Sequence, residues 1–139
     1  MGKEMEKEKN FMINKLRFEG EYLNGKRNGK CKEYNAKTGK IIFEGEYLNG
    51  KRWEGKVYYL LNNEVFGLKN GRGWSIEYSY EYGNIIFEGE YINGERNGKG
   101  KEFYNGTLKF EGEYLNGKRN GKGKEYYDNG ISTLSPPNL

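Results

Sequence analysis

Pairs of glutamates two residues apart are the first candidates for chemistry in this sequence. The pairs are Glu19/Glu21, Glu44/Glu46, Glu88/Glu90 and Glu111/Glu113. On a β-strand, residues two apart lie on one face, roughly 6–7 Å from each other. That spacing falls in the range that separates the two carboxyl groups of glycosidases. An active site is single, however, and these pairs recur in every clear repeat. We therefore interpret them as structural partners of lysines on a neighbouring strand.

Other site chemistry is restricted by residue types that the sequence lacks. The 139 residues include no His, and Cys31 and Asp128 are the only residues of their types. These absences exclude a His-based zinc site, a Cys₄ site, a disulfide framework and a His-dependent catalytic triad. The Gly-x-Gly segments do not continue into a nucleotide-binding GxGxxG or GK[ST] motif. We therefore expect no cofactor and no metal.

The charge is nearly balanced. Lys and Arg number 24 and Asp and Glu number 20, which gives a net charge of +4. This excess is too small for a dedicated nucleic-acid binder, so we expect no nucleic-acid partner. It does not forbid contact with an anionic membrane. The apolar stretches are too short to span a bilayer, and residues 1–17 show no signal-peptide pattern. We expect a cytoplasmic location. A peripheral position at a membrane or at the cytoskeleton is compatible with it.

The chain is built from repeats, which should be sought before other patterns. Clear units begin at Phe18, Phe43, Phe87 and Phe110 with the string FEGEY followed by Leu or Ile and Asn-Gly. The 44-residue interval between Phe43 and Phe87 leaves room for one more unit, which we place near Val65 in an eroded form. The sequence therefore predicts five units.

Each unit has the pattern of a β-hairpin. In FEGEY the aromatic residues and Gly alternate with the glutamates, as expected of a strand with one apolar face. Asn-Gly follows, and both residues tolerate the positive φ of a tight turn. A second strand of alternating Gly and Lys closes the unit, so that its lysines face the glutamates. Stacked units would then share one thin core. We expect it to hold a row of rings: Phe18, Tyr22, Phe43, Tyr47, Phe87, Tyr91, Phe110 and Tyr114.

The unit resembles the MORN repeat (membrane occupation and recognition nexus). The residues that carry the resemblance in the last unit are Phe110–Tyr114, Asn116-Gly117, Gly121-x-Gly123 and Asn129-Gly130. The sequence departs from the family where Tyr replaces a common Trp at the end of the first strand. It also departs where Asn or Trp53 replaces a common His after the turn Arg.

The resemblance implies an all-β protein: an elongated, single-layer antiparallel sheet of about five stacked hairpins, grooved on one side. It also implies a non-enzymatic scaffold that binds a protein partner through the grooved aromatic face, with self-association as an added property. Binding to an anionic membrane is a second interpretation. A third is an inhibitor, or an antitoxin-like blocker of a partner protein.

Two residue sets are candidates for contacts with partners. Cations beside the turns could bind lipid headgroups, although ordinary solubility of the turns explains them better, because Glu95 interrupts the row and the net charge is low. They are Lys26, Arg27, Lys51, Arg52, Arg96, Lys118 and Arg119. Aromatic residues of the irregular middle could form a protein-binding patch, or they could repair packing where glycines are lost. They are Trp53, Tyr58, Tyr59, Phe66, Trp74, Tyr78 and Tyr80.

The two ends differ from the repeats. Residues 1–17 are rich in Glu and Lys and fit either a charged arm or a short helix that covers the edge of the first hairpin. The repeat array is expected over residues 18–130. Residues 131–139 fit a capping segment or a tail.

Overall fold

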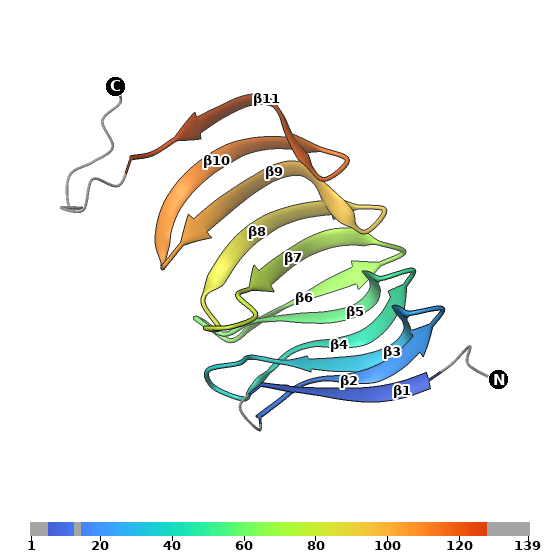
Figure 1. The fold of residues 1–139 in the computed structure, drawn as a ribbon. Coiled ribbons are helices and arrows are strands. Elements are labelled where there is room, and N and C mark those ends of the chain that lie inside the picture. Colours follow the sequence, from blue (N-terminus) through green and yellow to red (C-terminus); the bar gives the residue numbers. More distant parts are fainter. Residues whose placement is uncertain (1–5, 13–14, 128–139) are drawn as a thin grey trace.

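The computed structural model describes residues 6–12 and 15–127, and these form one open antiparallel sheet (Figure 1). Its eleven strands follow each other in chain order, and each pairs with the next. The strands are β1 (Glu6–Met12), β2 (Lys15–Leu23), β3 (Lys26–Tyr34), β4 (Ile41–Leu48), β5 (Lys51–Tyr59), β6 (Glu64–Lys69), β7 (Arg72–Tyr78), β8 (Ile85–Ile92), β9 (Glu95–Tyr104), β10 (Thr107–Leu115) and β11 (Lys118–Glu125). The described part contains no helix, so the all-β expectation is confirmed.

Five hairpins correspond to the five expected units: β2–β3, β4–β5, β6–β7, β8–β9 and β10–β11. Asn93 and Gly94 have φ values of 56° and 77°, the left-handed backbone that an Asn-Gly turn requires. The turns also bond to the preceding unit along one edge of the sheet. Gly50 N donates to Arg27 O at 2.8 Å, and Gly117 N donates to Arg96 O at 2.9 Å.

The expectation of a short N-terminal helix is wrong. Residues Glu6–Met12 form β1, which pairs antiparallel with β2 from Glu6 opposite Tyr22 to Met12 opposite Lys15. The outer edge of β2 carries backbone hydrogen-bonding groups that need partners, and β1 pairs with them. The alternating Glu and Lys of β1 are typical of a strand at the edge of a sheet. The expected cap or tail at residues 131–139 lies outside the described residues.

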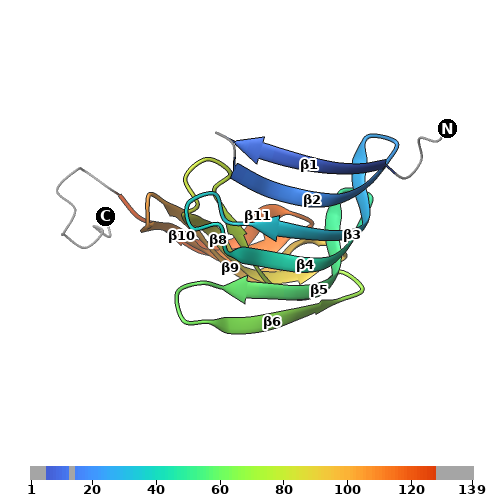
Figure 2. The same cartoon turned by 90° about the horizontal axis from the view of Figure 1, so that it is seen from below.

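The sheet is strongly curved, as the view from below shows (Figure 2). Curvature concentrates at β6, which pairs with β7 only through Leu68 and Lys69. Two loops meet across the hollow side, where Asn35 Nδ2 donates to Gly83 O at 2.9 Å. A guanidinium nitrogen of Arg17 donates to Tyr80 O at 2.6 Å nearby. The sheet therefore has a concave side, closed at one end by loop contacts, and a convex side.

The core lies on the concave side. Phe18, Phe43 and Phe87 are fully buried, and Phe110 is 6% exposed. The ring of Phe87 lies over Gly100 of the neighbouring strand, where an added Cβ would meet the ring at 2.6 Å. The absence of a side chain at this position is therefore what makes room for the ring.

Candidate functional site

An arginine covers the core phenylalanine in each of the four clear units. The distances from guanidinium carbon to ring centroid are 3.8 Å for Arg27 on Phe18, 4.9 Å for Arg52 on Phe43, 4.1 Å for Arg96 on Phe87 and 4.0 Å for Arg119 on Phe110. Such cation–π contacts contribute about 0.5–2 kcal/mol each, depending on desolvation. The arginine reaches the concave side because it pairs directly with the unit's inward tyrosine, as Tyr91 does with Arg96.

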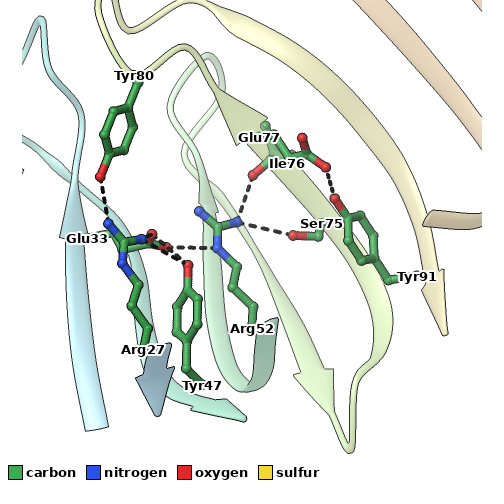
Figure 3. A network of polar contacts seen from close by, with 9 residues as sticks. All are labelled: Arg27, Glu33, Tyr47, Arg52, Ser75, Ile76, Glu77, Tyr80 and Tyr91. Carbon is green, nitrogen blue, oxygen red and sulfur yellow. Dashed lines mark hydrogen bonds and ion pairs between the residues drawn. The ribbon is translucent and has the colours of Figure 1, made fainter. Parts of the chain in front are cut away.

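A glutamate from the preceding unit joins three of these arginines to a tyrosine. Glu33 accepts hydrogen bonds from Tyr47 Oη at 2.8 Å and from Arg52 Nε at 2.8 Å (Figure 3). Tyr91 and Arg96 donate to Glu77 in the same way, and Tyr114 and Arg119 donate to Glu102. We call each set a Glu–Tyr–Arg triad. The three triads link consecutive units by charge-assisted hydrogen bonds, which are stronger than neutral ones.

One position that could hold a triad glutamate carries valine instead. Val57 lies opposite Phe43 just as Glu33 lies opposite Phe18, and it is fully buried. Within the next hairpin, β6–β7, Leu68 stands opposite Gly73 at the pair where the other hairpins place the triad tyrosine opposite the arginine. A buried carboxylate there would lack both donors, which is costly. An apolar valine at this position is therefore consistent with the eroded unit, which lacks the tyrosine and arginine that would bind a glutamate.

Arg52 bridges across this eroded unit. Its Nη1 donates to Ser75 Oγ at 3.2 Å and to Ile76 O at 2.8 Å, both on β7 (Figure 3). Its side chain is only 14% exposed. Because Arg52 also pairs with Glu33, it ties the first three units together where the sheet bends most.

The triads shift the pKa of their members. Burial alone would raise the pKa of Glu77, but the hydrogen bonds and charge of Arg96, with the Tyr91 hydroxyl, outweigh it and hold the pKa below its usual value. Arg119 is the main cause that lowers the pKa of Glu102. Burial, and then the adjoining carboxylate, raises the pKa of the Tyr47 and Tyr91 hydroxyls. All these groups therefore hold one charge state at neutral pH, as structural groups do, rather than exchanging protons.

A cavity of about 440 Å³ opens on the concave side above the triads. It runs from the loop residues Asn35, Ala36 and Ser79 to the turn residues Lys51 and Glu95. Ile42, Tyr47, Tyr78 and Tyr91 are among its lining residues, with Tyr80, 55% exposed, at the loop end. No side-chain polar atom buried in the described part of the chain lacks a hydrogen-bond partner. The cavity is thus a preformed hollow whose walls combine aromatic and aliphatic side chains with charged members of the triads, such as Glu33, Arg52 and Glu77.

The cations suggested for lipid contact divide into two groups. The four arginines lie on the concave side within the triads or, for Arg27, in an ion pair with Glu33 at 2.9 Å. The lysines lie beside the turns, and Lys51 also lines the turn end of the cavity, where its Nζ pairs with Glu95 Oε2 at 3.0 Å. Lys51 and Lys118 stand opposite Leu48 and Leu115, which are 42% and 48% exposed. Lysines and leucines, not arginines, are therefore what the turn edge presents to its surroundings.

The seven aromatic residues of the irregular middle do not form one continuous surface. Tyr59, Phe66 and Trp74 pack in a row with ring centroids 6.4 and 6.3 Å apart. Tyr78 joins β7 to β5 by donating to Tyr58 O at 3.0 Å. Four of the seven are therefore engaged in packing.

The remaining three lie apart from each other. The ring of Trp53 lies against the turns at Gly71 and Gly94. The Tyr58 hydroxyl donates to Glu44 at 2.9 Å. Tyr80 stands at the end of the cavity, so it is the member of the set that is placed to touch a ligand there.

The repeated glutamate pairs lie on the convex side, and most of their members face lysines, whereas Glu90 stands opposite Trp74. Glu88 and Glu111 both stand opposite Lys101, and Glu44 stands opposite Lys32. This pairing is the structural arrangement expected from the sequence. The described residues contain no group of three or more His, Cys, Asp or Glu side chains that could hold a metal. They also contain no helix long and apolar enough to cross a membrane.

Sequence reasoning missed the triad glutamates, although a signal was present. Glu33 and Glu77 each precede the tyrosine that they bind by 14 residues, and Glu102 precedes its tyrosine by 12. Continuing the alternation of Gly98 and Gly100 along β9 also places Arg96 and Glu102 on the concave side. A polar position on the apolar face, recurring at the repeat period, is the pattern that identifies such residues.

Stacked hairpins joined by recurring triads define a tandem β-hairpin repeat protein. The MORN repeat family model matches residues 18–37, 43–53, 87–108 and 110–132, together more than half of the chain. The chain therefore belongs to the MORN repeat family, whose repeats are in general scaffolds that bind proteins or lipids. The eroded unit lies between the second and third matched segments. Comparisons with curated proteins and with solved structures gave no significant match.

Proposed function

We propose that this protein is a non-catalytic scaffold that binds a segment of a partner protein in its concave cavity. The observation that carries the proposal is the cavity of about 440 Å³, whose walls are held in place by the triads. Binding sites are typically concave, largely apolar and preformed, with few polar groups to fix orientation. Here Lys51 and Glu95 at the turn end, and Asn35 at the loop end, are such groups.

The chemistry of the cavity favours an extended segment with a bulky apolar side chain. Ile42, Tyr47 and Tyr78 would surround that side chain, and Tyr80 would cover it from the loop end. A rigid receptor loses little conformational entropy on binding, which favours affinity for a given contact area. The same geometry would also suit an inhibitory role, in which the cavity binds a loop of the target protein and thereby blocks it.

The test is selection of peptides on the full-length protein from a random display library. An Ala36→Arg variant would place a charged side chain at the cavity wall, and Tyr104→Ala would alter an exposed ring that does not line the cavity. The proposal expects selected peptides to lose most of their affinity for Ala36→Arg and to bind Tyr104→Ala like the unchanged protein. Equal affinity for all three proteins would contradict it.

Membrane attachment is the second candidate, and the turn edge supports it. Exposed leucines that stand opposite lysines, as at Leu48 and Lys51, provide an apolar and a cationic contact together. Each cation near an anionic surface contributes about 1 kcal/mol. We expect any such binding to depend on Lys26, Lys51 and Lys118.

Liposome co-sedimentation separates the two candidates. Vesicles with and without phosphatidylserine would be compared at low and physiological salt, using the Lys26/Lys51/Lys118→Ala variant. A Lys37/Lys40/Lys56→Ala variant removes equal charge from exposed positions away from the turn edge and is the matched control. Pelleting that only the turn variant loses supports the membrane candidate. If the protein does not pellet with anionic vesicles at low or at physiological salt, the membrane candidate is ruled out.

A further inference from the structure

Three of the four interfaces between consecutive units, β3–β4, β7–β8 and β9–β10, follow one sequence pattern, which we call the code. The second strand of one unit places two small residues and then a glutamate opposite the Tyr, Gly and Phe of the next unit. In β3 these are Gly29, Cys31 and Glu33 against β4, and in β9 they are Gly98, Gly100 and Glu102 against β10. Lysines between them face the glutamates of the next unit, as Lys99 faces Glu113.

Strand β11 carries the complete code with no strand on its outer side among the described residues. Gly121, Gly123 and Glu125 repeat the small–small–glutamate set, and Lys122 and Lys124 supply the cations. Glu125 has a side chain that is 72% exposed, compared with 10% for Glu33. Its carboxylate accepts a hydrogen bond from Arg119 of its own unit, with 2.7 Å between Arg119 Nη1 and Glu125 Oε2. Every residue of β11 is exposed.

At the other end of the sheet, β1 occupies the matching position on β2 but fits the code poorly. Its Lys7 and Lys9 stand opposite Glu21 and Glu19, as the code requires. Opposite Tyr22, Gly20 and Phe18, however, it places Glu6, Glu8 and Asn10 in place of two small residues and a glutamate. At all three of these register positions β11 has the residue that the code requires and β1 does not.

Charge excludes the simplest alternative, a symmetric pairing of two β11 strands. Antiparallel pairing with Gly123 opposite its counterpart would place Lys122 opposite Lys124 of the other copy, twice. Like charges directly opposite each other destabilise a sheet. A strand with glutamates on both sides of a glycine is what complements β11, and β2 is such a strand.

We propose that copies of this chain associate head to tail, with β11 of one copy pairing with β2 of another and displacing β1 from it. Gly123 then lies opposite Gly20, Lys122 opposite Glu21 and Lys124 opposite Glu19. Glu125 gains Tyr22 and Arg27 as triad partners. The contact is heterologous, so it propagates into open chains or closes into rings. It uses the sheet edges and does not depend on the concave cavity proposed above for partner binding.

Disulfide trapping in the full-length protein tests this register. In a Cys31→Ser background, a Lys122→Cys chain is mixed with a Glu21→Cys chain, and a Lys124→Cys chain is mixed with a Glu19→Cys chain. Ser75 occupies the position of Cys31 in β7, so the background substitution is conservative. Lys40→Cys mixed with Glu21→Cys is the out-of-register control, since Lys40 is exposed on a loop. Circular dichroism of each chain checks that it is folded.

We expect both in-register mixtures to form mixed disulfide dimers under mild oxidation, several-fold more than the control mixture. Sedimentation of the unchanged protein should show larger species at higher concentration. Disulfides between a Lys122→Cys chain and a Lys124→Cys chain, at the same level, would indicate symmetric pairing and overturn the proposal. Monomers at every concentration and trapping no greater than in the control would overturn it as well. Peptide binding to the cavity would be unaffected by either outcome.

Discussion

Glu33 and Arg52 form an ion pair at 2.8 Å across the boundary between the first and second units, with both side chains largely buried. The same carboxylate binds Tyr47 and Arg27. Glu33 is thus the single acceptor for three donors from two units. Its position makes the rigidity of the concave face depend on a polar contact and not on apolar packing alone.

Loss of this acceptor should destabilise the protein strongly. We predict that Glu33→Gln lowers the free energy of unfolding by about 3–5 kcal/mol, because Arg52 is left buried without its counter-charge. Urea unfolding followed by circular dichroism measures the change. Glu46→Gln is the control, since Glu46 is exposed and lies opposite Glu54. It should change stability by about 0.5 kcal/mol or less. Equal effects of the two substitutions would refute the structural role of Glu33.

Packing of rings over glycines gives a second prediction. Gly100→Ala would place a methyl group 2.6 Å from the Phe87 ring, which is fully buried. Overpacking of this kind costs about 1–3 kcal/mol. At Gly67 an added methyl group meets no atom within 4 Å, so Gly67→Ala should be neutral or slightly stabilising. Thermal unfolding of both variants decides the matter, and a stable Gly100→Ala protein would mean that the ring does not lie over this glycine.

Acid should weaken the triads. Despite burial, which acts in the opposite direction, Arg96 and Tyr91 hold the pKa of Glu77 below its usual value, and Arg119 does the same for Glu102. In the unfolded chain a glutamate has a pKa of about 4.3. The folded state therefore binds fewer protons, so the triad contribution is present above that pH and is lost as the pH falls through the lower folded-state pKa values.

The prediction is a steep loss of stability below about pH 5 that is shallower in Glu77→Gln. Chemical unfolding at a series of pH values gives the two slopes. The slope of a Glu90→Gln protein should follow that of the unchanged protein, because Glu90 is exposed on the convex side. Parallel curves for all three proteins would show that Glu77 carries no such linkage.

The cysteine provides a probe of local opening. Burial, and then the nearby Glu33 carboxylate, raises the pKa of the Cys31 thiol to about 12. The thiolate is the reactive form, so a thiol reagent at pH 8 should label Cys31 only as fast as the sheet opens. Labelling should accelerate in Glu33→Gln by about the factor by which the substitution raises the equilibrium constant for opening. Immediate labelling of the unchanged protein in the absence of denaturant would contradict this placement.

Much of the fold could be predicted from local sequence. The repeat of FEGEY and Asn-Gly is sufficient for hairpins, turns and the lysine–glutamate face, because each depends on neighbours within one unit. The row of core rings follows from the same alternation. The alternating Glu and Lys of β1 lack an apolar face, so no local pattern distinguishes that strand from a helix or an arm.

The concave face could not be predicted in the same way. Arg52 in particular resembles a turn cation, because it lies three residues before Gly55 and the alternation is broken there. Its pairing with the inward Tyr47 is what shows that it lies inside. The bend at β6 depends on what the eroded unit lacks, namely the pair of tyrosine and arginine at the place where Leu68 stands opposite Gly73. Contacts between loops, such as that of Asn35 with Gly83, join residues 48 positions apart. They arise from the curvature and leave no periodic signal.

Amide NMR of the labelled protein, titrated with a peptide selected on it, tests the central claim most directly. Binding in the concave cavity predicts that the largest shifts occur at Ala36, Ile42 and Ser79, with little change along β11. Shifts confined to β11, or to the turn edge around Leu48 and Leu115, would contradict the claim.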